Sequence, residues 1–380
     1  MEEQLGTGLD DLGIPDIPEP DENVEDLVVK DLFDSAVKYA FIGVGHAGSR
    51  LVQSFYDIGY RRVCVVNTAK QDLDEIKIPE ENKLWLGSGG AAKTRRLGAH
   101  YTSNRYEDII SLMRRCFGNS FERVIVCCAA GGGTGSGGFE TAIKAGNDLV
   151  ESLRIKKVGD PTRVGLLIAL PTNAERDRMH NTWEAMKAVE QLMRNSAISP
   201  VIVADNERIN AIFRSATLGD VWQKANKSIA GLFHLFNKIS TASTKYTAFD
   251  PADYNALIDL GFVTYGVMRI KSTAKDDLAE AMRKNVELNV LSGGFSLKGA
   301  KASACLFVGE EAVLDQIPAE NVEHAYEQLG RVISGGVVHR GIYAQKGQPL
   351  TAYTIVGGMQ IPKERLDEIS RIAGKTDWDE

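Results

Sequence analysis

VIVCCAAGGGTGSGG, residues 124–138, decides the fold of this chain. An apolar run that suits a buried strand leads into a glycine-rich turn, and helix-forming residues follow from Phe139. A turn of this kind brings main-chain N–H groups and the positive end of a helix to one point. The stretch therefore predicts an anion-binding loop, in which glycines permit close approach and Thr134 and Ser136 add hydroxyl donors.

The same order of strand, turn and helix repeats through the first half of the chain. Strand-like apolar runs occupy residues 39–44, 62–66, 124–129, 164–170 and 200–203, with helical stretches between them. This alternation predicts an α/β fold with a doubly wound parallel sheet, whose ligands bind at the carboxyl ends of the strands. A long central helix over 218–238 is expected to join it to a smaller α+β domain with a mixed sheet.

The N-terminal segment differs in composition from the rest of the chain. Residues 1–37 hold 12 of the 51 acidic residues and only Lys30 of the 44 basic ones, together with Pro15, Pro18 and Pro20. Such a segment buries too little apolar surface to fold alone, so we expect an acidic disordered tail, with a short helix over 28–37. The remaining body carries little net charge, and no nucleic-acid groove is expected.

Cysteine and histidine usage indicates an ordinary cytoplasmic protein. The five cysteines lie mostly in apolar runs, which is typical of buried free thiols, and no histidine spacing indicates a metal site. The acidic start does not suit a signal peptide, and no apolar run approaches the roughly 18 residues of a membrane span. We therefore expect cytoplasmic localisation, no membrane insertion and no protein-borne metal centre.

Two further glycine runs bear on the ligand. Residues 43–48, GVGHAG, fit the GxGxxG dinucleotide fingerprint, but Asn67-Thr68-Ala69 stands where an NAD-binding fold wants an acidic residue. An NAD-dependent oxidoreductase of the Rossmann type is thereby disfavoured. Residues 87–94, GSGGAAKT, approach a P-loop, but Ala92 replaces a glycine and no strand precedes them. They predict a loop that closes over a phosphate.

The run GGGTGSGG resembles the signature loop of the tubulin/FtsZ superfamily of filament-forming GTPases, and the resemblance extends over residues 39–358. The pattern looks closest to the archaeal CetZ proteins, through GVGHAG, VNTAKQDL at 66–73 and Glu81-Asn82-Lys83, with FtsZ as the runner-up. The resemblance implies a cytoskeletal protein that binds GTP or GDP, with Mg²⁺ held mainly through phosphates, and polymerises head to tail. It also implies these domains: an acidic tail (1–37), a GTP-binding domain (38–217), a central helix (218–238), a GTPase-activating C-terminal domain (239–360) and a C-terminal tail (361–380).

The resemblance assigns nucleotide-binding roles by position. They fall on Gly45, His46, Ala47, Gly48, Ser49 and Arg50 in the first loop, Asn67 in the second, Gly131, Gly132, Gly133, Thr134, Gly135, Ser136 and Gly137 in the fourth, Glu175 and Arg178 at the ribose, and Asn206 and Trp222 at the guanine. Residues 87–93 would form the third loop, which senses the γ-phosphate. Arg176 is an alternative to Arg178, and Asp220, Gln223 and Asn226 are alternatives to Trp222. An amide at Asn206 both donates and accepts, which suits guanine and rejects adenine.

In this superfamily, acidic residues of one subunit reach the γ-phosphate of the next. Asp250 and Asp253 in AFDPAD, residues 248–253, match the last two positions of the Asn-x-Asp-x-x-Asp loop of FtsZ, and Ala248 departs from the first. The resemblance implies that they are the catalytic residues of a GTPase whose site is completed between subunits. Because of Ala248, a scaffold that assembles with little hydrolysis is the alternative. Both aspartates also suit the start of a helix, where they would act as caps. Roles such as cell shape or cell division, and docking proteins on the acidic tail, are further expectations.

Overall fold

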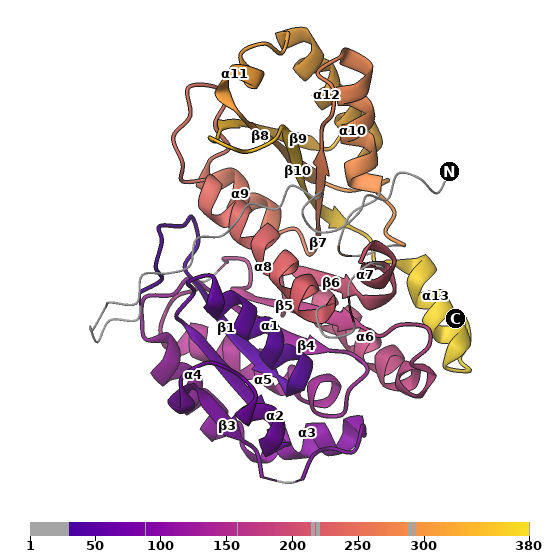
Figure 1. Cartoon of the computed structure of the whole chain (residues 1–380). Helices are drawn as coiled ribbons and strands as arrows, with labels where there is room; N and C mark the ends of the chain where they lie inside the picture. The colour runs from indigo at the N-terminus through magenta and orange to yellow at the C-terminus, as the bar shows by residue number, and fades with distance from the viewer. Residues whose placement is uncertain are drawn as a thin grey trace. The chain divides into compact units, whose positions relative to one another are not determined.

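The computed structural model describes residues 30–87, 89–157, 159–213, 217, 221–287, 291 and 294–379. By internal packing they divide into two compact units, residues 30–207 with 363–379, and residues 208–362 (Figure 1). The predicted tail residues 1–29, Ser88 of the third loop and residues 218–220 of the predicted helix lie outside the described residues.

In the described part of the first unit, parallel strands follow the order β3-β2-β1-β4-β5-β6. Their bounds are β1 (Tyr39–Val44), β2 (Val63–Asn67), β3 (Lys83–Trp85), β4 (Arg123–Ala129), β5 (Val164–Leu170) and β6 (Val201–Asp205). Every residue of β1, β2, β5 and β6 is buried, as expected for parallel strands covered on both faces. The predicted doubly wound α/β fold is confirmed.

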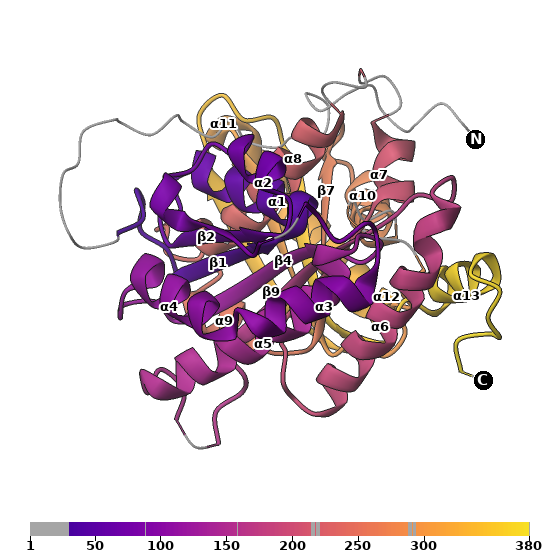
Figure 2. The ribbon, with the colours of Figure 1, turned by 90° about the horizontal axis from the view of Figure 1, so that it is seen from below.

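Helices cover both faces of this sheet. Figure 2 shows α1 and α2 over one face and α4 and α5 over the other. The helices are α1 (Gly45–Asp57), α2 (Lys70–Asp74), α3 (Arg95–Asn104), α4 (Tyr106–Phe117), α5 (Thr134–Ser152), α6 (Met179–Arg194) and α13 (Lys363–Ile372), with 3₁₀ turns η2 (Glu80–Asn82) and η3 (Arg176–Arg178). The chain leaves β6 through α7 (Asn206–Ile212), which crosses the boundary between the units at residue 207.

The end of the predicted acidic tail belongs to the folded body. Asp31 Oδ2 lies 2.7 Å from Arg62 Nη1, and Asp31 Oδ1 accepts the main-chain N–H of Arg61. Both charged side chains are buried, and no helix forms over residues 30–37. The boundary at residue 37 and the expected short helix are therefore wrong for this segment, because a distant basic partner decides its structure.

The C-terminal segment, expected as a tail, also packs against the first unit. Helix α13 lies against α6, with Leu366 and Ile369 fully buried. Beyond it Trp378 is 1% exposed, edge to face with Trp183 and under the Lys187 ammonium. Leu366 and Ile369 stand at helical spacing, which is the signal from which α13 is predictable.

In the described part of the second unit, the strands follow the order β7-β10-β8-β9. The pairings β7–β10 and β10–β8 are antiparallel and β8–β9 is parallel, so the predicted mixed sheet is confirmed. Helices α10 and α12 pack against each other beside the sheet (Figure 1). The elements are α8 (Val221–Ile239), α9 (Pro251–Ile258), β7 (Phe262–Arg269), α10 (Lys275–Glu287), β8 (Ala302–Gly309), α11 (Glu311–Leu314), α12 (Ala319–Val332), β9 (Val337–Ala344) and β10 (Thr351–Met359).

All five cysteines are free and buried, which confirms the expectation of buried thiols. No cluster of three or more His, Cys, Asp or Glu side chains suited to a metal ion occurs among the described residues. In the same ranges, no helix combines the length and the apolar character needed to cross a membrane.

His234 makes the stability of the second unit sensitive to acid. It lies on α8 and is 7% exposed, and burial together with Lys238 lowers its pKa from 6.5 to about 4. In the unfolded chain His234 takes up a proton near pH 6.5, whereas in the folded chain it does so only near pH 4. The free energy of unfolding therefore has its full value above pH 6.5 and decreases as the pH falls from 6.5 to about 4. At pH 5 the loss amounts to about 2 kcal/mol.

We predict that His234→Leu loses about 2 kcal/mol less unfolding free energy than the wild type when the pH falls from 8 to 5. Urea unfolding at the two pH values measures this difference. His180→Gln, at an exposed position on α6, should keep the wild-type loss. Equal losses in the wild type and His234→Leu would contradict the prediction.

Candidate functional site

A pocket of ≈ 180 Å³ opens at the carboxyl ends of β1, β2 and β4. It brings together all four predicted loops, although they are far apart in the sequence. Its lining comprises Gly45, His46, Asn67, Thr68, Ala69, Asp72, Gly90, Ala91, Lys93, Gly133, Thr134 and Gly135. Ligands of doubly wound sheets bind at this edge, so the pocket is the candidate ligand site.

Two helices begin at this pocket, α1 at Gly45 and α5 at Thr134. Neither N-terminus has a side-chain cap, and neither first turn contains an acidic residue. The first N–H groups of a helix have no partner within the helix, and the helix dipole adds positive potential there. Two such ends beside Lys93 make the pocket suited to a polyphosphate.

Only some of the predicted hydroxyl donors face the pocket. Thr134 and Thr68 lie there, with their hydroxyl oxygens 2.6 Å apart. Ser136 is fully buried and donates to the carbonyl of Gly132, while Ser49 donates to the carbonyl of Gly45 at 2.8 Å. The two serines thus hold the first turns of α5 and α1, and Thr134 is the predicted hydroxyl that borders the ligand space.

Most of the motif glycines are required by packing of the protein on itself. A Cβ on Gly98 of α3 would lie 2.1 Å from the carbonyl oxygen of Gly133, and one on Gly137 would lie 2.1 Å from that of Arg95. In α1, a Cβ on Gly48 would lie 2.1 Å from the carbonyl oxygen of Cys127. These distances are far below any real contact, so α3 packs on α5, and α1 on β4, only through glycine.

Gly132 differs from its neighbours in the run. A Cβ there would meet nothing within 4 Å, and its φ lies outside the left-handed region, so the protein fold itself does not require glycine. Gly131 is again restricted by packing, because its Cβ would lie 2.8 Å from Arg178 Cβ. Gly132 is therefore the glycine of the run with open space beside it, and it is adjacent in sequence to Gly133 of the pocket lining.

A carboxylate that the sequence reasoning missed stands in the pocket. Asp72 Oδ2 accepts from Asn67 Nδ2 at 2.9 Å, and Asp72 Oδ1 lies 3.5 Å from His46 Nδ1. Asn67 is thereby turned toward Asp72. The signal was present in VNTAKQDL, where Asp72 falls in the first turn of the helix after β2.

The third loop is tied to η3 and to the first turn of α6. Lys93 Nζ lies 2.7 Å from Asp177 Oδ2, which lowers the pKa of Asp177, and Asn181 Nδ2 donates to the carbonyl of Lys93 at 2.7 Å. Ala92 and Lys93 have φ of 46° and 56°, a left-handed conformation that non-glycine residues seldom adopt. Strain of this kind persists where surrounding contacts hold it and is common at ligand sites.

The predicted ribose residues are together. Glu175 Oε2 accepts from the N–H of Thr172 at 2.9 Å, and Glu175 Oε1 lies 2.8 Å from Arg178 Nη1. The alternative, Arg176, is exposed in η3. Asn206 directly follows β6 as the first residue of α7.

Other predicted residues lie apart from the pocket lining. Arg50 is exposed on α1, where Nη2 lies 3.4 Å from Glu75 Oε2, and Ala47 also belongs to α1. Trp222, Gln223 and Asn226 lie on α8 of the second unit, so their guanine contact stays a prediction, and Asp220 lies outside the described residues.

The predicted catalytic loop precedes α9 in the second unit. Asp250 is the N-cap of α9 and accepts the N–H of Asp253 at 2.9 Å, so the expected capping role is present. Asp253 Oδ1 lies 2.9 Å from His339 Nδ1 of β9. Tyr343 of β9 accepts from the N–H of Phe249 at 2.8 Å, and burial with the nearby carboxylates raises its pKa. Strand β9 thus fixes the loop, while Asp250 itself stays exposed.

Comparison with known proteins agrees with this geometry. The Tubulin/FtsZ family, GTPase domain, matches residues 38–214. The chain is 22% identical to the cell division protein FtsZ of Helicobacter pylori over 301 residues, 75% of this chain and 71% of that protein. It is 26% identical to the tubulin-like protein CetZ2 of Haloferax volcanii over 344 residues, 85% and 89% of the two chains.

A solved structure shows the same fold. A GTPγS-form protofilament of TubZ from Bacillus thuringiensis serovar israelensis matches with a TM-score of 0.79 and 19% identity, covering 90% of this chain and 92% of that one. The tubulin-like resemblance, with CetZ and FtsZ among the relatives, is confirmed.

Substitution of two glycines separates packing from ligand binding. We predict that Gly132→Ala keeps or slightly raises thermal stability, since alanine restricts the unfolded chain and meets no neighbour, but weakens binding of fluorescent GDP. Gly98→Ala should lower the unfolding free energy by about 1–3 kcal/mol or more, because two backbones must separate. Thermal unfolding without ligand and a GDP titration measure the two effects. A destabilised Gly132→Ala with unchanged GDP binding would reverse the assignment.

Proposed function

We propose that this chain is a GTPase of the tubulin/FtsZ family, because the model of that family's GTPase domain matches residues 38–214. It binds GTP in this pocket, polymerises head to tail and hydrolyses GTP at a site that the next subunit completes. The observation that carries the proposal is the convergence of two uncapped helix N-termini and Lys93 on one pocket. This arrangement favours a polyphosphate over any neutral ligand.

Recognition of the nucleoside follows from the strand ends beside the phosphate pocket. The Glu175 carboxylate accepts hydrogen bonds, as a ribose hydroxyl requires, and Arg178 holds it at 2.8 Å. Asn206, placed at the end of β6, offers an amide that pairs with the donor and acceptor edge of guanine. Trp222 is proposed as a second base contact, by stacking.

A magnesium ion fits the donor set of the pocket. The Asp72 carboxylate and the hydroxyls of Thr68 and Thr134 are hard oxygen ligands, and a carboxylate beside a triphosphate needs a cation between them. Mg²⁺ is expected to be held mainly through the phosphates, with Asp72 orienting its water shell. When bound, it neutralises charge that develops on the phosphate oxygens.

Hydrolysis is assigned to Asp250 and Asp253 of the adjoining subunit. One carboxylate orients a water whose oxygen bonds to the γ-phosphorus while the bond from that phosphorus to the β–γ bridging oxygen breaks. The electron pair of the broken bond stays on the GDP oxygen, and the proton of the water leaves through the carboxylate to solvent. The other carboxylate holds the surrounding water and cation network. His339 keeps Asp253 in place from β9, and the exposed Asp250 remains accessible to a neighbouring subunit.

Self-assembly is supported by the relatives. The TubZ structure is a protofilament, and head-to-tail contacts of this heterologous kind extend into open filaments. Cell division is the role named for the FtsZ relative, and for this chain we propose a cytoplasmic filament of that general kind, serving division or cell shape. Docking proteins on the acidic N-terminal tail are part of the same proposal.

The alternative is a nucleotide-binding scaffold that assembles with little hydrolysis. Ala248 favours it, because the FtsZ loop has an asparagine there and a methyl group cannot hydrogen-bond. An NAD-dependent oxidoreductase is disfavoured, because β2 ends at Asn67 and not at an acidic residue.

Two substitutions of Asp250 separate catalysis from capping. Asparagine is as good an N-cap as aspartate, so Asp250→Asn keeps the start of α9 and removes only the charge. We predict that both Asp250→Asn and Asp250→Ala still bind GTP and sediment as polymer. Their rate of phosphate release should fall by about 10²-fold or more. Sedimentation and phosphate release with GTP, ATP and no nucleotide measure these effects.

The wild type should assemble with GTP and not with ATP. Tight NADH binding without assembly would refute the GTPase proposal. Assembly of the wild type without phosphate release would favour the scaffold, and full activity of Asp250→Asn would remove Asp250 from catalysis.

A further inference from the structure

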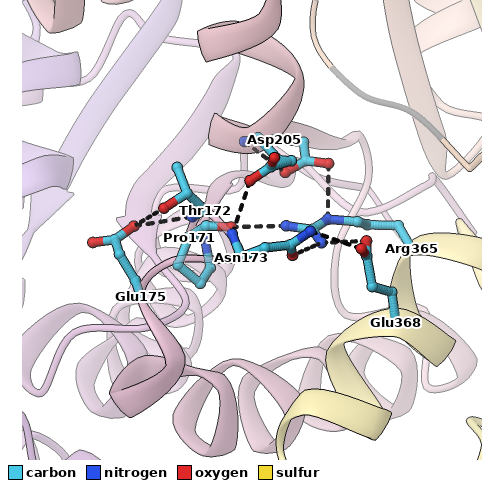
Figure 3. A network of polar contacts seen from close by, with 8 residues as sticks. Pro171, Thr172, Asn173, Glu175, Asp205, Arg365 and Glu368 are labelled. Carbon is cyan, nitrogen blue, oxygen red and sulfur yellow. Dashed lines mark hydrogen bonds and ion pairs between the residues drawn. The ribbon is translucent and has the colours of Figure 1, made fainter.

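Arg365 of α13 is a buried arginine with four partners (Figure 3). It is 6% exposed. Nη2 donates to the carbonyl of Pro171 at 2.8 Å, and Nη1 donates to Asn173 Oδ1 and to Glu368 Oε2, each at 2.6 Å. Nε lies 2.9 Å from Asp205 Oδ2 in an ion pair. Nη1 and Nη2 of the guanidinium therefore donate hydrogen bonds, and Nε faces the carboxylate of Asp205.

These partners stand at the ends of two neighbouring strands. Pro171 directly follows β5, and Asp205 is the last residue of β6. Glu175 lies on the connection after β5, where its carboxylate accepts from the N–H of Thr172, and Asn206 directly follows Asp205. Arg365 thus bridges the two strand ends (Figure 3), and the proposed ribose residue Glu175 and guanine residue Asn206 follow these ends in the sequence.

A second set of hydrogen bonds closes the ring around Arg365. Asp205 Oδ1 accepts from the N–H of Glu207 at 3.1 Å, and Glu207 Oε2 accepts from the N–H of Asn173 at 2.8 Å. Asn173 Nδ2 donates to Glu368 Oε1 at 2.7 Å. The residues on either side of Asn206 are therefore held to the β5 connection, both directly and through α13.

Burial makes this network sensitive to loss of one member. Asp205 and Arg365 are each 5% exposed or less in their side chains, and burial raises the pKa of Asp205 although Arg365 opposes this. Without the guanidinium, the buried Asp205 carboxylate loses its charged partner and keeps only the N–H of Glu207, and the carbonyl of Pro171 loses the donor Nη2. Such orphaned groups regain water or rearrange, and both outcomes move the loops that carry them.

We propose that Arg365 is a positioning residue for the nucleoside half of the pocket, so that the C-terminal helix sets the affinity and selectivity for guanosine. The inference rests on the proposed function. The partners of Arg365 belong to the connection after β5, to β6 and to α13, whereas the candidate phosphate pocket is built at β1, β2 and β4. Loss of Arg365 should therefore weaken nucleoside recognition and spare polyphosphate binding.

The test compares GDP, ADP and pyrophosphate on the full chain by calorimetry. Arg365→Gln should bind GDP about ten-fold more weakly, with the GDP over ADP preference reduced by a similar factor and pyrophosphate affinity unchanged within about two-fold. Arg365→Lys, which keeps the charge but loses the fork geometry, should fall between the wild type and Arg365→Gln. Arg371→Gln, exposed on the same helix, is the matched control and should behave as the wild type.

Glu368→Gln keeps the test informative where Arg365→Gln fails to fold. Glu368 is 40% exposed and holds Arg365 and Asn173 from the rim of the network, so a smaller loss of GDP affinity with unchanged pyrophosphate binding is expected. Equal losses for GDP and pyrophosphate, or wild-type preference in every folded variant, would overturn the inference. A wild type that binds pyrophosphate with no preference for GDP would instead overturn the proposed function.

Discussion

The backbone contact between α3 and α5 is the constraint on which the candidate phosphate site depends. Helix α3 approaches so closely that Gly98 lies against the carbonyl of Gly133, and Gly137 lies against that of Arg95. Because α3 follows the third loop directly, this contact also sets where Ala91 and Lys93 stand over the N-terminus of α5. The end of the third loop and the start of α5 are thus packed directly on each other, which the absence of glycine side chains makes possible.

This constraint changes how the glycine run is understood. From sequence it predicts a phosphate cradle, and the pocket is indeed where the run places it. The structure adds that a side chain on Gly133 would clash with Ala91 and Thr94 before α3, one on Gly137 with α3, and one on Gly131 with Arg178, whereas Gly132 has open space beside it. The hydroxyl of Ser136 likewise supports the turn. Sequence shows that small residues are needed, but not whether a ligand or a helix fills the space beside each one.

The fold was predictable wherever a local pattern encodes it. The apolar runs of β1 and β5 match their observed bounds because parallel strands buried on both faces are apolar throughout. Residues 31–37 and the role of α13 were missed for the opposite reason. The position of Asp31 is fixed by its ion pair with Arg62, and Arg365 contacts Asn173 at a separation of 192 residues. No short window of sequence contains both partners of either pair. Charged residues near a chain end resemble a solvated tail until the partner is seen.

The candidate site consequently has parts with different physical supports. The candidate phosphate half depends on backbone packing between helices, which tolerates no added atom at the contact. The proposed nucleoside half depends on a buried ionic network whose central arginine comes from α13. The proposed catalytic loop is held by β9, through Tyr343 and His339. Because these supports are separate, substitutions in the ionic network or beside β9 are expected to act on the proposed base selectivity or hydrolysis, while the glycine packing that shapes the candidate phosphate cradle stays unchanged.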